Sequence, residues 1–99
     1  MENEKNLLGF IGLLFRANKI QIGANLWHHI DEVSLFLKAK DANSGEALRY
    51  EKKIKSRHLP LVEVNLTMAE LGSALGRAEV TYIGVMGKKA AMAVLSKTH

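Results

Sequence analysis

The stretch LVEVNLTMAELGSALG, residues 61–76, contains the strongest local signals of structure in the chain. Its first four residues form a short, mostly apolar run of the kind that builds a strand. Thr67 and Glu70 follow at the spacing of a capping box, in which each side chain bonds the backbone N–H of the other residue. We therefore expect a helix over residues 68–75 that ends at Gly76, since glycine is favoured just after the last helical residue.

The N-terminal part predicts a helix, a strand and the start of a second helix. Asn6 can cap a helix whose apolar residues recur every three or four positions as far as Phe15. The alternation of polar and apolar side chains in residues 19–22 predicts a strand. Gly23 interrupts that alternation, and we expect a helix from there to near Ile30.

The middle of the chain predicts a buried strand and a third helix. Residues 33–37 are mostly apolar and begin with the β-branched Val33, which is typical of a strand covered on both faces. Ser44 or Asn43 can cap a helix over residues 45–58. That helix must end before Pro60, because a proline disfavours the helical conformation of the residue before it.

The C-terminal part completes a series of five helices and four strands. Residues 80–86 predict the fourth strand, Gly87 a turn, and residues 88–97 a closing helix. We therefore expect one α/β domain over residues 1–99, a three-layer α/β/α sandwich. Its four-stranded mixed sheet should carry helices on both faces, with right-handed crossovers between parallel strands.

The composition fits one small globular domain. Hydrophobic residues make up 47% of the 99 residues and charged residues 24%, whereas disordered chains combine low hydrophobicity with high charge. The absence of cysteine excludes disulfides and thiolate ligands, and it fits a cytoplasmic location. The apolar run at residues 7–15 is shorter than the roughly 20 residues that span a bilayer, so we expect no membrane association. A net charge of +4 favours polyanionic partners.

Three segments are candidates for function, and each also has a plain structural explanation. Residues 23–25 open a helix with small residues whose amides suit phosphate, but a glycine turn and helix cap is the commoner reason for such a pattern. Residues 38–57 hold seven Lys or Arg against three acids, which fits either a phosphate backbone or a solvated helix face. Residues 76–80 form a short loop that could simply connect a helix to a strand. They can contribute to a binding site only if the strand that follows them lies beside the strand that leads into the second helix.

The sequence contains no pattern of catalytic residues. Adjacent helical residues point about 100° apart, so His28 and His29 do not share a face as metal ligands would. A nucleotide-binding glycine loop and a nucleophile elbow are missing. We expect no enzyme, no metal, no cofactor and no small-molecule substrate. Trp27 and Tyr82 are candidates either for stacking on bases or for core packing.

Three stretches carry a resemblance to a known family. They are Leu8-Gly9 with Arg16-Ala17-Asn18-Lys19, the strand at 61–64 with the Glu-Leu-Gly and Ala-Leu-Gly motifs after it, and Gly23-Ala24-Asn25. Together with the order of elements, they resemble the kink-turn-binding ribosomal protein superfamily of the archaeal L-seven-Ae type, in particular its small bacterial YlxQ-like branch. Asn18 stands where that branch usually has glycine. The resemblance covers nearly the whole chain.

The resemblance implies a site for kinked RNA at the start of the second helix. In the family this helix start enters the widened groove of the kink, where Asn and Glu side chains contact sheared G·A pairs. The family's Glu and Lys positions are Leu26 and His29 here. By the same resemblance, the loop at 76–80 covers bulged nucleotides. The RNA-binding residues that it implies are Lys19, Gly23, Ala24, Asn25, Leu26, His29, Arg77, Ala78 and Val80.

We therefore predict an RNA-binding, ribosome-associated protein that recognises a kink-turn or a similarly kinked RNA, such as ribosomal RNA. The alternative is a protein-interaction module on the same fold with weak or non-specific RNA binding. Leu26 and Trp27, which replace polar RNA contacts, and the apolar first helix motivate that alternative. A third hypothesis, an enzyme fragment, rests on the resemblance of the fold to domains attached to RNA methyltransferases, but a methyl-donor-binding segment is missing.

Overall fold

The computed structural model describes residues 2–98, and within them it confirms the expected α/β architecture. The four strands form one mixed sheet in the order β1-β4-β2-β3. The elements along the chain are α1 (Glu2–Arg16), β1 (Ile20–Gln21), α2 (Gly23–His28), the 3-10 turn η1 (Ile30–Glu32), β2 (Val33–Lys38), α3 (Gly45–Ser56), β3 (Leu61–Glu63), α4 (Met68–Leu75), β4 (Tyr82–Met86) and α5 (Lys88–Lys97).

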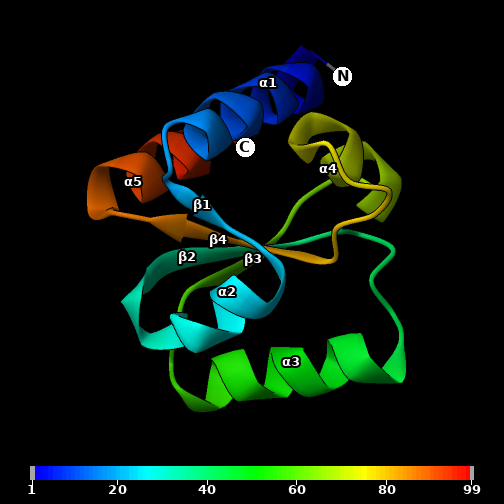
Figure 1. Ribbon diagram of the computed structural model, residues 1–99, viewed down its shortest axis with the longest axis vertical. Coiled ribbons are helices and arrows are strands. Elements are labelled where there is room, and N and C mark those ends of the chain that lie inside the picture. Colours follow the sequence, from blue (N-terminus) through cyan, green and yellow to red (C-terminus); the bar gives the residue numbers. More distant parts are fainter. Residues whose placement is uncertain (1, 99) are drawn as a thin grey trace.

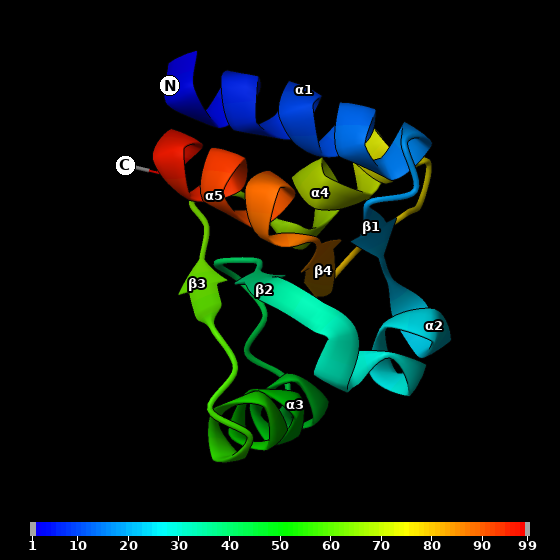
Figure 2. The same ribbon diagram turned by 90° about the vertical axis from the view of Figure 1, so that its left-hand side faces the viewer.

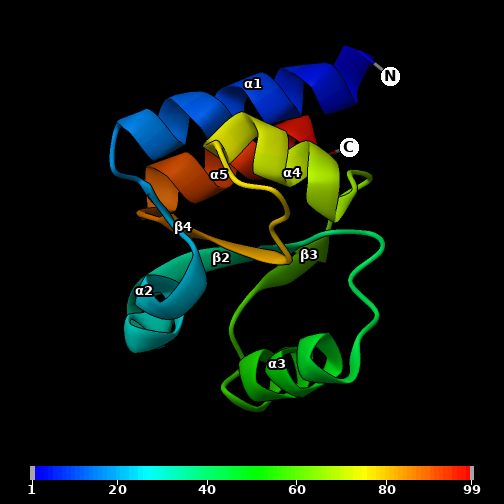
Figure 3. The ribbon, with the colours of Figure 1, turned by 45° about the vertical axis from the view of Figure 1, so that its right-hand side comes forward.

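Helices cover both faces of the sheet. In Figure 1, α1, α4 and α5 lie on one side of the strands, and α2 and α3 lie on the other. The view from the side separates the same layers (Figure 2), and Figure 3 shows α1, α4 and α5 packed together above the strands. Within residues 2–98, no helix is both long and apolar enough to cross a membrane.

Antiparallel pairing joins β4 to both of its neighbours in the sheet. Gln21 of β1 lies opposite Gly84, and Phe36 of β2 lies opposite the same residue on the other side. β2 and β3 run parallel, and α3 connects them. The central position of β2 explains its apolar sequence, because Leu35, Phe36 and Leu37 are all nearly or completely buried.

Local signals determine boundaries of α3 and α4. Thr67 and Glu70 form both hydrogen bonds of the capping box, and Gly76 ends α4 in the left-handed conformation, with φ 70°. Ser44, rather than Asn43, caps α3 by accepting a hydrogen bond from the backbone N–H of Ala47. These features place α4 at the residues expected from the sequence.

The starts of α1 and β4 differ from the sequence-based prediction, α2 and α3 end about two residues earlier than expected, and β1 and β3 are shorter than expected. The helix α1 begins at Glu2, so Asn6 lies inside the helix and does not cap it. The residues before Asn6 include glutamate and lysine, which are good helix formers and extend the helix. The strand β4 begins at Tyr82 rather than Val80, because the backbone N–H of Val80 donates to the carbonyl of Met68 instead of to the sheet.

The turn after α1 places Asn18 in a conformation that glycine adopts freely, and glycine is the usual residue at this position in the family that the sequence resembles. Asn18 has φ 61°, in the left-handed region that glycine adopts freely. Asparagine tolerates this region better than other side chains do. The backbone N–H of Lys19 then donates to the carbonyl of Leu14 at 2.8 Å, which closes the turn. Asn18 therefore adopts the conformation that the turn into β1 requires.

Candidate nucleic-acid interface

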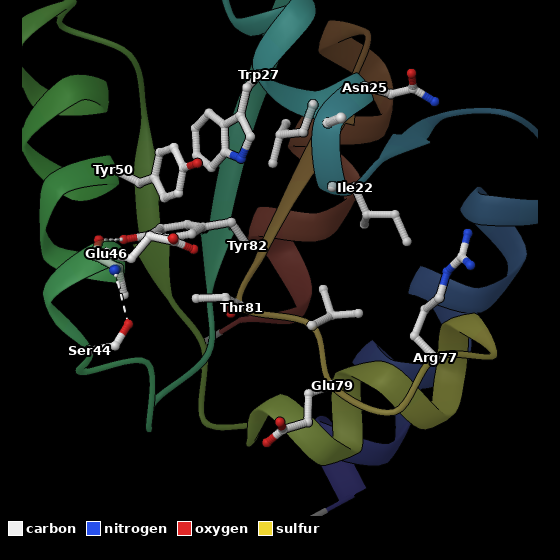
Figure 4. Close-up of a pocket in the computed structure, with 15 residues that line it drawn as sticks. Ile22, Asn25, Trp27, Ser44, Glu46, Tyr50, Arg77, Glu79, Thr81 and Tyr82 are labelled. Atoms are coloured by element: carbon white, nitrogen blue, oxygen red, sulfur yellow. Dashed lines mark hydrogen bonds between the residues drawn. The ribbon is translucent and has the colours of Figure 1, made fainter.

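A cavity of about 660 Å³ opens between α2, the first half of α3 and the loop that joins α4 to β4. Figure 4 shows the side chains that line it, which come from segments 22–27, 44–50 and 77–82. The volume lies within the range of small-molecule and nucleotide sites. Three segments that are distant in sequence thus share one concave surface.

The pairing of β1 with β4 brings the first and third of these segments together. Gly23 follows β1 after one residue, and the loop that contains Arg77 leads into the start of β4. Because Gln21 pairs antiparallel with Gly84, the end of β1 lies beside the middle of β4. The sequence left open whether these strands are neighbours, and the structure shows that they are.

The start of α2 exposes its backbone to the cavity. Gly23 has φ 63°, a left-handed conformation in which other side chains are strained. Ile22 precedes the helix in an extended conformation and offers no side-chain cap. Gly23, Ala24 and Asn25 are all exposed and line the cavity. Small residues at this point leave room for another molecule to approach the chain.

The loop opposite α2 is fixed to α4 at both ends. The backbone N–H of Arg77 donates to the carbonyl of Gly72 at 2.8 Å, and that of Val80 donates to the carbonyl of Met68 at 3.0 Å. Gly72 lies so close to the loop that a Cβ atom there would meet the carbonyl oxygen of Arg77 at 2.7 Å. The cavity wall formed by this loop is therefore positioned by the helix beneath it.

The cavity brings together six of the nine residues implied by the family resemblance. Gly23, Ala24, Asn25, Leu26, Arg77 and Val80 line it, whereas Lys19, His29 and Ala78 do not. Lys19 lies at the far end of β1, where its carbonyl accepts from the backbone N–H of Met86. The side chain of His29 forms a 2.6 Å contact with Glu32.

The structure corrects the expected role of the Leu26 side chain. Leu26 is 1% exposed and packs against Gly84, where the absence of a Cβ atom makes room for it. Val80 is also buried. A buried side chain contacts neither a base nor a partner protein, so Leu26 gives no support to the protein-interaction alternative. Only the backbone of these two residues is available to a ligand.

Aromatic rings form one wall of the cavity. Trp27 stacks on Tyr50 with ring centroids 4.0 Å apart and an interplanar angle of 6°. Tyr82 meets Trp27 edge to face, and its hydroxyl donates to the carbonyl of Ala47 at 2.6 Å. Burial raises the pKa of Tyr82 to about 12, and the carboxylate of Glu51 adds to this shift. Tyr82 therefore belongs to the core, while the half-buried Trp27 lies in the cavity wall together with Tyr50, which the sequence analysis did not single out.

Several cations of the basic stretch at residues 38–57 are neutralised by carboxylates. Lys38 is 6% exposed and donates to Glu51 at 2.7 Å. Lys55 pairs with the same carboxylate, and Arg57 pairs with Asp31 at 2.7 Å. Charge counted along the sequence therefore overstates the positive charge that this segment offers to a phosphate backbone. Within residues 2–98, no three potential metal ligands are grouped together.

The ion pair of Lys38 and Glu51 should make stability depend on pH. The hydrogen bond from Lys38 holds the pKa of Glu51 below its usual value of 4.5, against the opposing effect of burial. A lowered folded-state pKa stabilises the protein above the unfolded-state pKa, and this stabilisation is lost as the pH falls through the folded-state value. We expect Glu51→Gln to lower the free energy of unfolding by roughly 1 kcal/mol at pH 7 and by little at pH 2. Urea unfolding at the two pH values measures this, and an equal deficit at both would contradict it.

Comparison with known proteins identifies the fold. The chain matches no protein-family model and no curated protein sequence. A protein of unknown function from Bacillus halodurans C has a similar structure, with a TM-score of 0.75 and 22% identity over 93% of this chain and 95% of that one. The 15.5kD RNA binding protein of Giardia lamblia is also similar, with a TM-score of 0.72 and 18% identity over 99% of this chain and 86% of that one. At these identities, the similarity shows a shared fold.

Proposed function

We propose that this protein binds structured RNA, without catalysing a reaction, at the cavity between α2, α3 and the α4–β4 loop. The observation that carries the proposal is that the pairing of β1 with β4 places exposed Gly23–Asn25 and Arg77 around one concave surface. The RNA-binding function of the Giardia lamblia protein with the same fold supports the proposal. The net charge of +4 favours a polyanionic partner.

Each part of the cavity matches a different part of an RNA chain. Arg77 is exposed, and within residues 2–98 its side chain forms no hydrogen bond or ion pair, so it is available to a phosphate. The amide of Asn25 both donates and accepts, which suits the edge of a base. The volume of the cavity suits a nucleotide that has left the helical stack, which is the usual target of sequence-specific RNA recognition.

We further propose that the RNA is a kink-turn or a similarly kinked element, and that the protein belongs to the kink-turn-binding superfamily and its ribosome-associated YlxQ-like branch. The motifs at Gly23–Asn25 and at Glu70–Gly76 support this assignment. Ribosomal RNA and a cytoplasmic location are parts of the same proposal. The burial of Leu26 leaves Asn25 as the polar side chain of α2 that lines the cavity.

A titration with three RNAs of equal length tests the proposal. The RNAs are a kink-turn, the same sequence with its G·A pairs disrupted, and a straight duplex. We expect the kink-turn to bind at least tenfold more tightly than the other two at the same salt concentration, because base contacts add to the common phosphate contacts. Equal affinities for all three RNAs would overturn specific recognition of a kinked RNA.

A further inference from the structure

A second groove lies between α1 and α4, two helices that cover the face of the sheet opposite α2 and α3 (Figure 1). It has a volume of about 370 Å³ and is lined by α1 together with Ala74 of α4. Its lining residues in α1 recur every three or four positions, so they form one face of that helix. They are Lys5, Leu8, Gly9, Gly12, Phe15 and Arg16.

The fold uses this face of α1 only in part. Leu7 and Ile11 are buried and attach α1 to the core, whereas Leu8 and Phe15 remain partly exposed. Gly9 is exposed, and nothing lies within 4 Å of the position that a Cβ atom would occupy there. A glycine inside a helix costs about 1 kcal/mol relative to alanine, so this one weakens α1 without serving an internal contact. The space above Gly9 is open to another molecule.

Two cations flank the apolar floor of the groove. Lys5 and Arg16 are the charged members of the described lining residues, and both are exposed. Among the side chains that the structure describes, neither forms a hydrogen bond or an ion pair. The residues from Lys5 to Arg16 span about 16 Å along the helix axis, or roughly three turns. An occupant with carboxylates at the same separation would complement both charges.

The groove suits a helix better than an extended peptide or a nucleic acid. An extended peptide gains affinity by pairing its backbone with a sheet edge, but this groove is lined by helices. A nucleic-acid backbone carries a charge at every nucleotide, whereas the cations here stand only at the two ends. A helix satisfies its own backbone and lays an apolar face into such a groove. Gly9 and Gly12 lack side chains, which lets a second helix axis approach α1 closely.

We propose that the groove between α1 and α4 docks an amphipathic helix of a partner protein. Apolar side chains of that helix lie over Gly9 and Gly12, and two of its acidic residues, three turns apart, pair with Lys5 and Arg16. The groove shares no lining residue with the cavity between α2, α3 and the α4–β4 loop. The protein can therefore hold the helix and an RNA together, and the inference does not depend on RNA binding.

A labelled synthetic helical peptide of about 18 residues tests the inference, because that length suffices for a helix. It carries leucines at i, i+4 and i+7 between two glutamates three turns apart, and its control has lysines in place of the glutamates. We expect the acidic peptide to bind about tenfold more tightly than the basic one in fluorescence anisotropy at low salt. The double variant Lys5→Gln and Arg16→Gln should remove most of this preference. Lys88→Gln with Lys89→Gln, which removes the same charge from exposed positions on α5, should retain it.

A second pair of variants tests the place of binding. Gly9→Leu fills the groove with a side chain that favours the helix, so the protein should fold and bind the acidic peptide at least about tenfold more weakly. Asn6→Leu adds the same side chain to an exposed position of α1 outside the groove and should leave the affinity unchanged. Circular dichroism of both variants verifies that they are folded.

Four outcomes would overturn the inference. Equal affinity for the acidic and basic peptides would refute the pairing with Lys5 and Arg16. Undiminished binding to Gly9→Leu would place the peptide elsewhere on the protein. Displacement of the peptide by a straight RNA duplex would identify the groove as a nucleic-acid surface. A dimer in analytical ultracentrifugation that Gly9→Leu dissociates would make a second copy of the chain the occupant. Failure of kinked RNA to bind would refute the proposed function and leave this inference standing.

Discussion

A Gly72→Ala variant is expected to lose about 2–3 kcal/mol of its free energy of unfolding, the upper part of the range for overpacked interiors. The added Cβ atom would lie 2.7 Å from the carbonyl oxygen of Arg77 and 2.8 Å from that of Ala78. Both are backbone atoms, so the strain cannot be relieved by rotating a side chain. The variant must either shift α4 or displace the loop that forms one wall of the cavity. The fraction that folds should therefore also bind RNA more weakly.

Gly9→Ala is the matched control for this substitution. Gly9 also lies in a helix, but no atom lies within 4 Å of the position that its Cβ would occupy. Alanine is favoured over glycine inside a helix by about 1 kcal/mol, so this variant should be more stable than the wild type. Urea unfolding of the two variants measures the difference. Similar stabilities would show that the contact between Gly72 and the loop is not rigid.

An Asn25→Ala variant is expected to bind its RNA about 30-fold more weakly. The estimate follows from the 1–3 kcal/mol that a good contact to a base edge contributes. The side chain of Asn25 is exposed and, among the described residues, has no hydrogen-bond partner, so its removal should leave the stability of the protein unchanged. A loss of affinity with an unchanged unfolding curve would identify Asn25 as a binding residue rather than a structural one.

Asn6→Ala serves as the control, because Asn6 is an exposed asparagine on α1 that does not line the cavity.

The salt dependence of RNA affinity is a second measurement that distinguishes base contacts from phosphate contacts. A lost base contact lowers affinity at every salt concentration without changing the slope, whereas a lost phosphate contact reduces the slope by about one. If Asn25→Ala weakened binding to a straight duplex as much as binding to the kinked RNA, the proposed role in base recognition would be wrong.

The sequence was sufficient to predict the elements whose ends have local chemical signals. The capping box at Thr67 and Glu70 and the turn at Gly87 gave the bounds of α4 and α5 correctly. Asn6 was wrong as a helix cap, because capping residues also occur inside helices when the preceding residues favour the helix. Leu26 was assigned to the RNA by position in a motif, and only the packing against Gly84 shows that its side chain is buried.

The composition of the cavity could not be predicted from the sequence in the same way. Tyr50 and Glu46 belong to α3, and only the position of that helix against the sheet brings them into the same cavity as Trp27. The ion pair between Lys38 and Glu51 joins residues 13 positions apart, so the sequence showed two unrelated charges in a basic stretch. Long-range packing therefore decides which of the side chains implied by sequence motifs act together.

Trp27 also gives this protein a built-in optical probe. It is the chain's single tryptophan, and it lies in the cavity wall in contact with Tyr50. Indole emission responds to changes in local polarity and in ring contacts, so occupation of the cavity should change the fluorescence of the unlabelled protein. A ligand that binds elsewhere on the surface would leave the emission unaltered. The aromatic wall thus allows binding at the cavity to be distinguished from general adhesion of a polyanion.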